Sequence, residues 1–349
     1  MKTVTVNTSV KYNVLIDKGI LNNAGKIVKD ALGLCKICVI TDDTVDSLYG
    51  KKAVESFAEA GFTVKKIVIE HGERSKNADN LINIVSSLAK MHFTRGDMLV
   101  ALGGGVVGDL CGFCAATYMR GIRFVQIPTT LLAAVDSSVG GKTAVDLPEG
   151  KNLFGAFWQP SMVICDTDTL DTLTEEFYAD GTAEVIKYGM IYDKQLFDTV
   201  KNGDWNREEV IARCIEIKRD VVSKDEFDLG IRQILNFGHT FGHGVEALSN
   251  FSVTHGAGVA IGMCIITRAL VKSGKIDKSV LDELEASLKA NKLPINCDYD
   301  YKKLFDRVVG DKKRIGDAIN LIVVKKIGEA EIVKMELDKI QELIKIGTN

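Results

Sequence analysis

The sequence Asp97-Met-Leu-Val-Ala-Leu-Gly-Gly-Gly-Val-Val-Gly-Asp109 joins a short apolar run to a glycine-rich loop, and a helical run follows. Apolar residues at 98–102 are typical of a buried strand. In a strand, loop and helix of this kind, glycines let backbone N–H groups approach a pyrophosphate, and the helix N-terminus favours its charge. A tight turn between strand and helix would also select glycine, so a purely structural role stays open.

The first half of the chain repeats this alternation of strands and helices. Short apolar runs predict strands near residues 3–7, 12–16, 36–41, 64–69, 97–102, 123–127 and 162–165. Helices are expected near residues 20–32, 45–60 and 77–91. Strands that alternate with helices over short connections form a parallel sheet covered by helices. We therefore expect an α/β, Rossmann-like nucleotide-binding domain over residues 1–175.

The second half has a different pattern. Apolar residues recur at three- and four-residue spacing, which predicts helices over residues 181–200, 207–223, 231–249, 256–273 and 278–290. The change falls near Thr172–Glu176, so an all-α or mainly helical C-terminal domain is expected over residues 176–349. Residues 319–324 and 330–333 around Gly328 predict a short hairpin before a last helix.

Composition restricts the class of partner. The 349 residues include 44 basic and 47 acidic side chains, a net charge of −3, and 46% hydrophobic residues, which suits a folded globular protein. Nucleic acid and membrane surfaces both require concentrated Lys and Arg, so neither is expected as a partner. No apolar run approaches the roughly 18 residues of a membrane span, and the N-terminus alternates like a strand, so we expect a cytoplasmic protein. An anionic ligand would need a local cluster of cations.

Eight cysteines include two Cys-x-x-Cys pairs, which could indicate a zinc ribbon or a redox motif. Cys35 and Cys38 lie in the apolar run of residues 34–40, and on a strand their three-residue spacing would point the side chains to opposite faces. Cys111 and Cys114 lie in a predicted helix and share one face. We expect all four to be small buried apolar residues, which is usual for free cysteine in a cytosolic protein.

The ordinary dinucleotide fingerprint is incomplete. It places an acid about 20 residues beyond the glycine loop to hold a ribose, but Arg123-Phe-Val-Gln-Ile127 stands there. Asp42 ends an earlier predicted strand, and Glu73 and Lys76 follow another. Because the ends of parallel strands border one crevice, these side chains are the alternative polar contacts.

A second glycine-containing segment, Asp136-Ser-Ser-Val-Gly-Gly-Lys-Thr143, ends like a P-loop. The first glycine of that motif would have to be residue 136, which is aspartate. The sequence therefore argues against a nucleoside triphosphatase.

Three of the five histidines lie within residues 239–255. His239 and His243 are one helical turn apart, and His255 follows closely, so their imidazoles could bind one ion such as zinc. A single helical histidine is more often structural, but this clustering favours a functional site. Glu184 and Lys187 are also one turn apart, and spacing alone favours a surface ion pair for them.

Eight segments along the chain form a recognisable set of motifs: residues 103–109, Arg120-Gly, Pro128–Thr143, Gly150-Lys-Asn152, Ala183–Lys187, Arg232–His243, His255-Gly and Asp311-Lys-Lys313. Taken together, these motifs resemble the 3-dehydroquinate synthase family along nearly the whole chain. Two departures are His71, where aspartate is usual, and residues 173–177, which lack the common proline and arginine. The broader superfamily, which includes glycerol-dehydrogenase-like enzymes, shares the fold but fewer of the motifs.

The resemblance implies a divalent metal, zinc by default with cobalt as an alternative, held by Glu184, His239 and His255. His243 then becomes a substrate contact. The substrate is implied to be a sugar phosphate, 3-deoxy-arabino-heptulosonate 7-phosphate, bound in a homodimer in which Arg120 reaches the phosphate of the neighbouring subunit. The other implied substrate and catalytic residues are Lys142, Asn152, Lys187, Lys218, Arg232, Asn236 and Lys313.

The resemblance also implies NAD as a cofactor. Its predicted contacts are Asp42, Glu73, Lys76, Gly105, Val106, Val107, Gly108, Asp109, Thr129, Thr130, Asp136, Lys142, Lys151, Thr169, Leu170, Asp171 and Thr172.

The implied reaction is a phosphate-eliminating lyase step of the shikimate pathway, which leads to aromatic amino acids. NAD transiently oxidises a secondary alcohol, phosphate leaves, the hydride returns, and an intramolecular aldol addition closes the carbocycle of 3-dehydroquinate. The alternatives are another sugar-phosphate cyclase, a metal- and NAD-dependent polyol dehydrogenase that releases NADH, and a non-catalytic nucleotide-binding protein.

Overall fold

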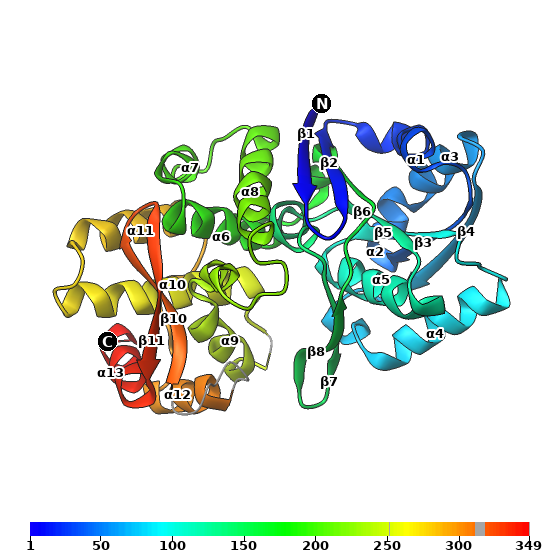
Figure 1. Ribbon diagram of the computed structural model, residues 1–349. Coiled ribbons are helices and arrows are strands. Elements are labelled where there is room, and N and C mark those ends of the chain that lie inside the picture. Colours follow the sequence, from blue (N-terminus) through cyan, green and yellow to red (C-terminus); the bar gives the residue numbers. More distant parts are fainter. Residues whose placement is uncertain (251, 311–317, 349) are drawn as a thin grey trace. The chain divides into compact units, whose positions relative to one another are not determined.

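The computed structural model describes residues 1–250, 252–310 and 318–348 (Figure 1). The chain forms two compact units. The first contains Met1–Leu173 and Arg207–Phe227, and the second contains Thr174–Asn206 and Asp228–Asn349. The fold class expected from the sequence is confirmed, because the first unit is a helix-covered, mainly parallel sheet and the second is mainly helical.

A seven-stranded sheet organises the first unit, in the order β1-β2-β9-β6-β5-β3-β4. β1 pairs with β2 antiparallel, and the other neighbours are parallel. Each of these strands lies within one residue of its predicted bounds. The bounds are β1 (Lys2–Asn7), β2 (Lys11–Asp17), β3 (Lys36–Asp42), β4 (Thr63–Ile69), β5 (Met98–Gly103), β6 (Arg123–Pro128) and β9 (Met162–Asp166).

Helices cover both faces of this sheet, so its central strands are buried on both sides. Leu99 on β5 packs into the core beneath α4 (Ala78–Lys90) and α5 (Gly105–Thr117). Val100, the next residue, packs into the opposite core with α1 (Ala24–Leu32) and α3 (Lys51–Glu59). This alternation of side chains explains the continuous apolar runs, because both faces of a strand in a parallel sheet are buried.

The cysteines are part of this packing. All eight lie in the described residues, and each is a free thiol. Cys38, Cys111 and Cys114 are buried in the core under α5, as expected of small apolar residues, whereas Cys35 is only partly buried. Burial raises the pKa of the Cys38 thiol to about 12, so the thiolate is strongly disfavoured there.

A hairpin that the sequence did not predict begins within the last two residues of the P-loop-like segment. β7 (Lys142–Leu147) pairs antiparallel with β8 (Gly150–Phe157). Gly140 and Gly141 adopt φ values of 97° and 70°, a conformation that favours glycine, immediately before β7. Lys142 therefore opens a strand rather than a helix, which agrees with the rejection of a P-loop.

The helix α8 (Arg207–Val222) belongs to the first unit, although its sequence position assigned it to the second domain. It packs against β1, β2 and the π-helical turn Ala133–Ser137. Helical periodicity identified the helix, but it could not show which core the apolar face of the helix joins.

The second unit is built around α10 (His255–Lys272), which packs against several neighbouring helices (Figure 1). By length and composition α10 could cross a membrane, but 72% of its apolar window is buried, as in the core helix of a folded unit. β10 (Ala318–Lys326) and β11 (Glu329–Glu336) form the expected hairpin. The other helices are α6 (Glu175–Ile191), α7 (Lys194–Val200), α9 (His239–Leu248), α11 (Lys278–Ala290), α12 (Tyr301–Gly310) and α13 (Leu337–Thr348).

Candidate active site

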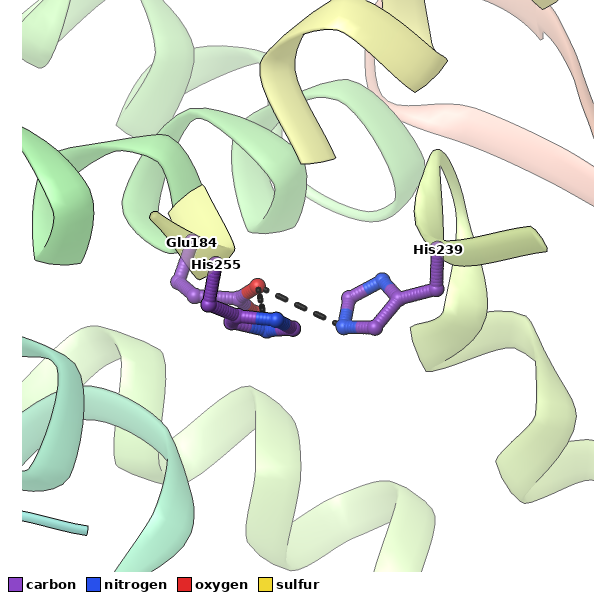
Figure 2. Close-up of side chains that lie close together, drawn as sticks. All are labelled: Glu184, His239 and His255. Carbon is purple, nitrogen blue, oxygen red and sulfur yellow. Dashed lines mark ion pairs between the residues drawn. The ribbon is translucent and has the colours of Figure 1, made fainter. Parts of the chain in front are cut away.

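Three donor side chains meet inside the second unit (Figure 2). Glu184 comes from the middle of α6, His239 is the first residue of α9, and His255 is the first residue of α10. Glu184 Oε1 lies 3.5 Å from His239 Nε2 and 3.6 Å from His255 Nε2. Their donor atoms all lie within 4.8 Å of one another.

This geometry fits a divalent metal. Bonds of about 2.1 Å in a tetrahedral site place neighbouring donor atoms about 3.4 Å apart, close to the spacing of the carboxylate and imidazole atoms here. One carboxylate oxygen and two imidazole nitrogens are donors suited to zinc or cobalt. The three residues that the sequence analysis proposed as ligands therefore form a chemically suitable set.

Glu184 and Lys187 are buried, contrary to the surface pair that spacing alone favoured. Each has 1% of its side chain exposed, and Lys187 Nζ donates a hydrogen bond to Glu184 Oε2. Every residue of α6 from Gly181 to Ile191 is buried, because this helix packs against α7, α10 and α11. A helix surrounded in this way lacks the polar face by which surface positions are recognised.

His255 contacts a carboxylate with each ring nitrogen. Its Nδ1 lies 3.2 Å from Oε1 of Glu246, a buried residue on α9. Burial lowers the pKa of His255, but the hydrogen bonds to Glu184 and Glu246 outweigh it and raise the pKa to about 10. In the absence of a metal ion, the two carboxylates thus favour a positive charge on this imidazole.

His243 lies one turn after His239 on the same helix, and its ring centroid is 5.5 Å from that of His239. It joins a different candidate donor set, with Glu246 and His255, rather than the set that contains Glu184.

Four of the predicted NAD contacts form a charged cluster in the first unit. Lys76 Nζ lies 3.0 Å from Asp109 Oδ2 and 3.5 Å from Glu73 Oε1, and Lys151 Nζ lies 3.7 Å from Glu73 Oε1. Burial lowers the pKa of Lys76, but Asp109 and Glu73 outweigh this effect and raise it. Lys76 is therefore held as a buried cation between carboxylates.

Asp146, which no sequence motif singled out, also belongs to this cluster, because its negative charge helps to raise the pKa of Lys76. Its Oδ1 accepts a hydrogen bond of 2.8 Å from the backbone N–H of Asn152, which adopts a φ of 56°. An acid six residues before a predicted substrate contact carried no recognisable signal, because the hairpin that joins them was not predicted.

The glycine loop has the close contacts expected of a cofactor turn. A Cβ atom at Gly108 would come within 2.7 Å of Gln126 Oε1 on β6, so glycine allows α5 to pack tightly on the sheet. Thr129 follows β6, and its buried Oγ1 has no hydrogen-bond partner among the residues that the structure describes. A buried hydroxyl of this kind, near a glycine turn, fits a polar cofactor group.

Two further groups of predicted residues lie in the first unit. Lys218 on α8 pairs with Asp136, with Nζ 2.9 Å from Oδ1. Asp42 ends β3, and its Oδ1 accepts a hydrogen bond from the backbone N–H of Val45. The 3₁₀ helix Thr167–Thr172 follows β9. The strands β3, β5, β6 and β9 run parallel, so their carboxyl ends share one edge of the sheet. The segments that follow these ends are Asp42, the glycine loop, Thr129-Thr130 and Thr169–Thr172.

The remaining predicted substrate residues are less clustered. Lys142 and Asn152 are exposed on the β7–β8 hairpin, and Arg120 is exposed in the turn after α5, with a φ of 66°. Arg232 and Asn236 lie in the 3₁₀ helix Ile231–Asn236 of the second unit, where Arg232 is 2% exposed. Lys313 lies outside the described residues.

Comparison with known proteins places these features in a family. Residues 66–180 match the family model for the N-terminal part of 3-dehydroquinate synthase, and residues 181–314 match the model for its C-terminal part. The chain belongs to the 3-dehydroquinate synthase family. A 3-dehydroquinate synthase of Clostridium kluyveri is 44% identical over 349 residues, which cover 97% of each chain.

Solved structures of two synthases have a similar fold. A 2-deoxy-scyllo-inosose synthase, complexed with carbaglucose-6-phosphate, NAD+ and Co2+, has a TM-score of 0.89 at 24% identity and covers 99% of this chain and 100% of its own. A 2-epi-5-epi-valiolone synthase from Streptomyces hygroscopicus, with NAD+ and Zn2+ bound, has a TM-score of 0.88 at 25% identity and covers 98% of this chain and 97% of its own.

Proposed function

We propose that this chain is a 3-dehydroquinate synthase of the shikimate pathway, converting 3-deoxy-arabino-heptulosonate 7-phosphate to 3-dehydroquinate and phosphate. Membership of the family, with 44% identity over nearly the full length of a relative, supports this activity. The structural observation that supports it best is the buried set of Glu184, His239 and His255, with the Lys187 ammonium against Glu184.

The cofactors are NAD and one divalent metal ion, zinc or cobalt. NAD when bound accepts and returns a hydride, and the ion polarises the reacting oxygens as a Lewis acid. Glu184, His239 and His255 would hold the ion. The glycine loop, Thr129 and the cluster of Glu73, Lys76 and Asp109 would hold NAD, together with the other contacts named from the sequence.

The chain's own residues mainly bind and orient the substrate. Its phosphate and carboxylate need cations, which Lys142, Lys187, Lys218, Arg232 and Lys313 supply. Lys187, Lys218 and Arg232 are nearly inaccessible to water, with 1%, 5% and 2% of their surface exposed, so their charges act with little solvent screening. Asn152, Asn236 and His243 add hydrogen bonds. Much of the acceleration then comes from positioning and preorganised charge.

The active form is proposed to be a cytoplasmic homodimer in which Arg120 binds the phosphate of the neighbouring subunit. Arg120 is exposed in the turn that follows α5, and its φ of 66° is unusual for a residue with a side chain. A backbone held in this way suits a side chain with a positional role.

One assay tests the activity against its alternatives. Purified protein is incubated with the heptulosonate phosphate, a divalent metal and NAD at a small fraction of the substrate concentration, and phosphate and dehydroquinate are measured. We expect both products in equal amounts, with many turnovers per NAD. NADH accumulation with a polyol would instead indicate a dehydrogenase, and turnover only with another sugar phosphate would indicate a different cyclase.

The ligand assignment has its own test. Glu184→Ala and His255→Ala should each lose bound metal, because two donors hold an ion much more weakly than three, while circular dichroism shows a folded chain. Glu176→Ala removes an exposed carboxylate from the same helix and should keep its metal. Metal content at the wild-type level in the first two variants would show that the ligand assignment is wrong.

A further inference from the structure

Glu246 is a buried carboxylate directly behind one of the proposed metal ligands. It lies on α9, seven residues after His239, and 3% of its surface is exposed. Its Oε1 is 3.2 Å from Nδ1 of His255, whose Nε2 is 3.6 Å from Oε1 of Glu184. The imidazole thus lies between two carboxylates, one of which is in the ligand set.

A neutral imidazole carries its proton on one nitrogen and its lone pair on the other, and only the lone pair binds a metal. A carboxylate that accepts the Nδ1–H therefore leaves the lone pair on Nε2. It also limits rotation of the ring about its bond to Cβ. In known metal sites, loss of such an outer partner typically costs 10–100-fold in metal affinity.

We propose that Glu246 is a positioning residue that holds the proton of His255 on Nδ1 and directs Nε2 at the metal. The inference rests on the proposed function, because it assumes that His255 is a ligand.

The packing of α9 on α10 leaves a defined space for this carboxylate. A Cβ atom at Gly258, one turn into α10, would lie 3.0 Å from Glu246 Cγ and 3.1 Å from the Gly242 carbonyl oxygen. Contacts this close would push the Glu246 side chain or the helix aside. Glycine at position 258 therefore lets Glu246 lie between the two helices and reach His255.

The same atoms permit a rival arrangement. His243, Glu246 and His255 also have donor atoms within 4.8 Å of one another, so Glu246 could be a ligand of a second ion. A second ion would take the place of the proton on Nδ1. The number of ions bound per chain, and the protonation of Nδ1, therefore distinguish a positioning residue from a ligand.

The test compares the wild-type protein with Glu246→Gln and Glu246→Leu, using Co2+ alone as the probe. Affinity is measured by competition with a chelator, and the fold of the metal-free chain by thermal unfolding. We expect one ion per chain, about 10–100-fold weaker binding in Glu246→Leu, and a smaller loss in Glu246→Gln, whose amide oxygen can still accept the Nδ1–H. Thr267→Val, a buried change elsewhere on α10, should alter stability but not affinity.

Nitrogen-15 NMR of the zinc-loaded protein gives a readout that a merely structural role would not change. The chain has only five histidines, so the ring signals of His255 can be assigned with the His255→Ala variant. We expect a protonated Nδ1 in the wild type and a changed Nδ1 environment in Glu246→Leu.

Three outcomes would overturn the inference: Glu246→Leu binding Co2+ within twofold of wild type, two ions per chain, or an unprotonated Nδ1. Wild-type protein that binds no Co2+, or His255→Ala that binds it as tightly, would instead refute the ligand set of the proposed function.

Discussion

The buried charge of Lys76 should contribute strongly to the stability of the folded chain. Lys76→Met would leave Asp109 without its 3.0 Å partner, and breaking a buried ion pair from one side typically costs about 3 kcal/mol or more. We expect a loss of this size in the free energy of unfolding measured with urea. Adding Asp109→Asn should recover part of it, because the asparagine carries no charge that needs a partner. Lys194→Met, which breaks an exposed pair with Asp198, should change stability little, and equal effects of the two lysine changes would contradict this account.

The sequence predicted some of these residues better than others, for physical reasons. Helical spacing and clustering were enough to find His239, His243 and His255, and resemblance to the family was needed to choose among them. The burial of Glu184 and Lys187 could not be predicted from spacing, because it depends on which helices surround α6. Glu246 lies three residues after His243, so it could have been found from the same helical face. Its contact with His255 needed the fold.

Helix packing also positions the proposed metal ligands, and its role can be tested at Gly262. A Cβ atom at Gly262 on α10 would overlap the carbonyl oxygen of Gly238, and one at Gly242 on α9 would lie 2.8 Å from the Gly258 carbonyl carbon. Gly262→Ala should therefore separate α9 from α10, cost about 1–3 kcal/mol of stability, and weaken metal binding, because these helices begin at His239 and His255.

Urea unfolding and Co2+ competition measure both effects. The control is Ala257→Ser, at a half-buried α10 position that lines a pocket of about 700 Å³, where added volume should be tolerated. A Gly262→Ala variant with wild-type stability and wild-type affinity for Co2+ would show that glycine at this position is not needed for the packing of α9 on α10.

Most elements could be predicted from periodicity, and the exceptions show its limits. Strands such as β3 and β5 are continuous apolar runs between turn residues, so their pattern is strong. The β7–β8 hairpin was missed because Gly140-Gly-Lys142 resembles the end of a phosphate loop, and β8 is partly exposed along its length. The unit to which α8 belongs depends on tertiary contacts, which a local pattern does not contain.

At the scale of the whole molecule, the two cofactors should stabilise different parts of the chain. All three proposed metal ligands lie in the second unit, whereas the glycine loop and the Lys76 cluster lie in the first. A ligand at 100 times its Kd stabilises the folded state that binds it by about 2.7 kcal/mol. Removing the metal should therefore increase hydrogen exchange in α6, α9 and α10, and adding NAD should protect the loop before α5.

The decisive peptide is α8, which lies between two segments of the second unit in sequence but packs with the first. Its Lys218 pairs with Asp136, a proposed NAD contact, so its exchange should respond to NAD and not to metal. Mass spectrometry of peptides from residues 207–222, with each cofactor added alone, measures this directly. Slower hydrogen exchange in α8 on adding metal without NAD would contradict this prediction. It would show that the stability of α8 depends on the proposed metal site of the second unit rather than on packing within the first.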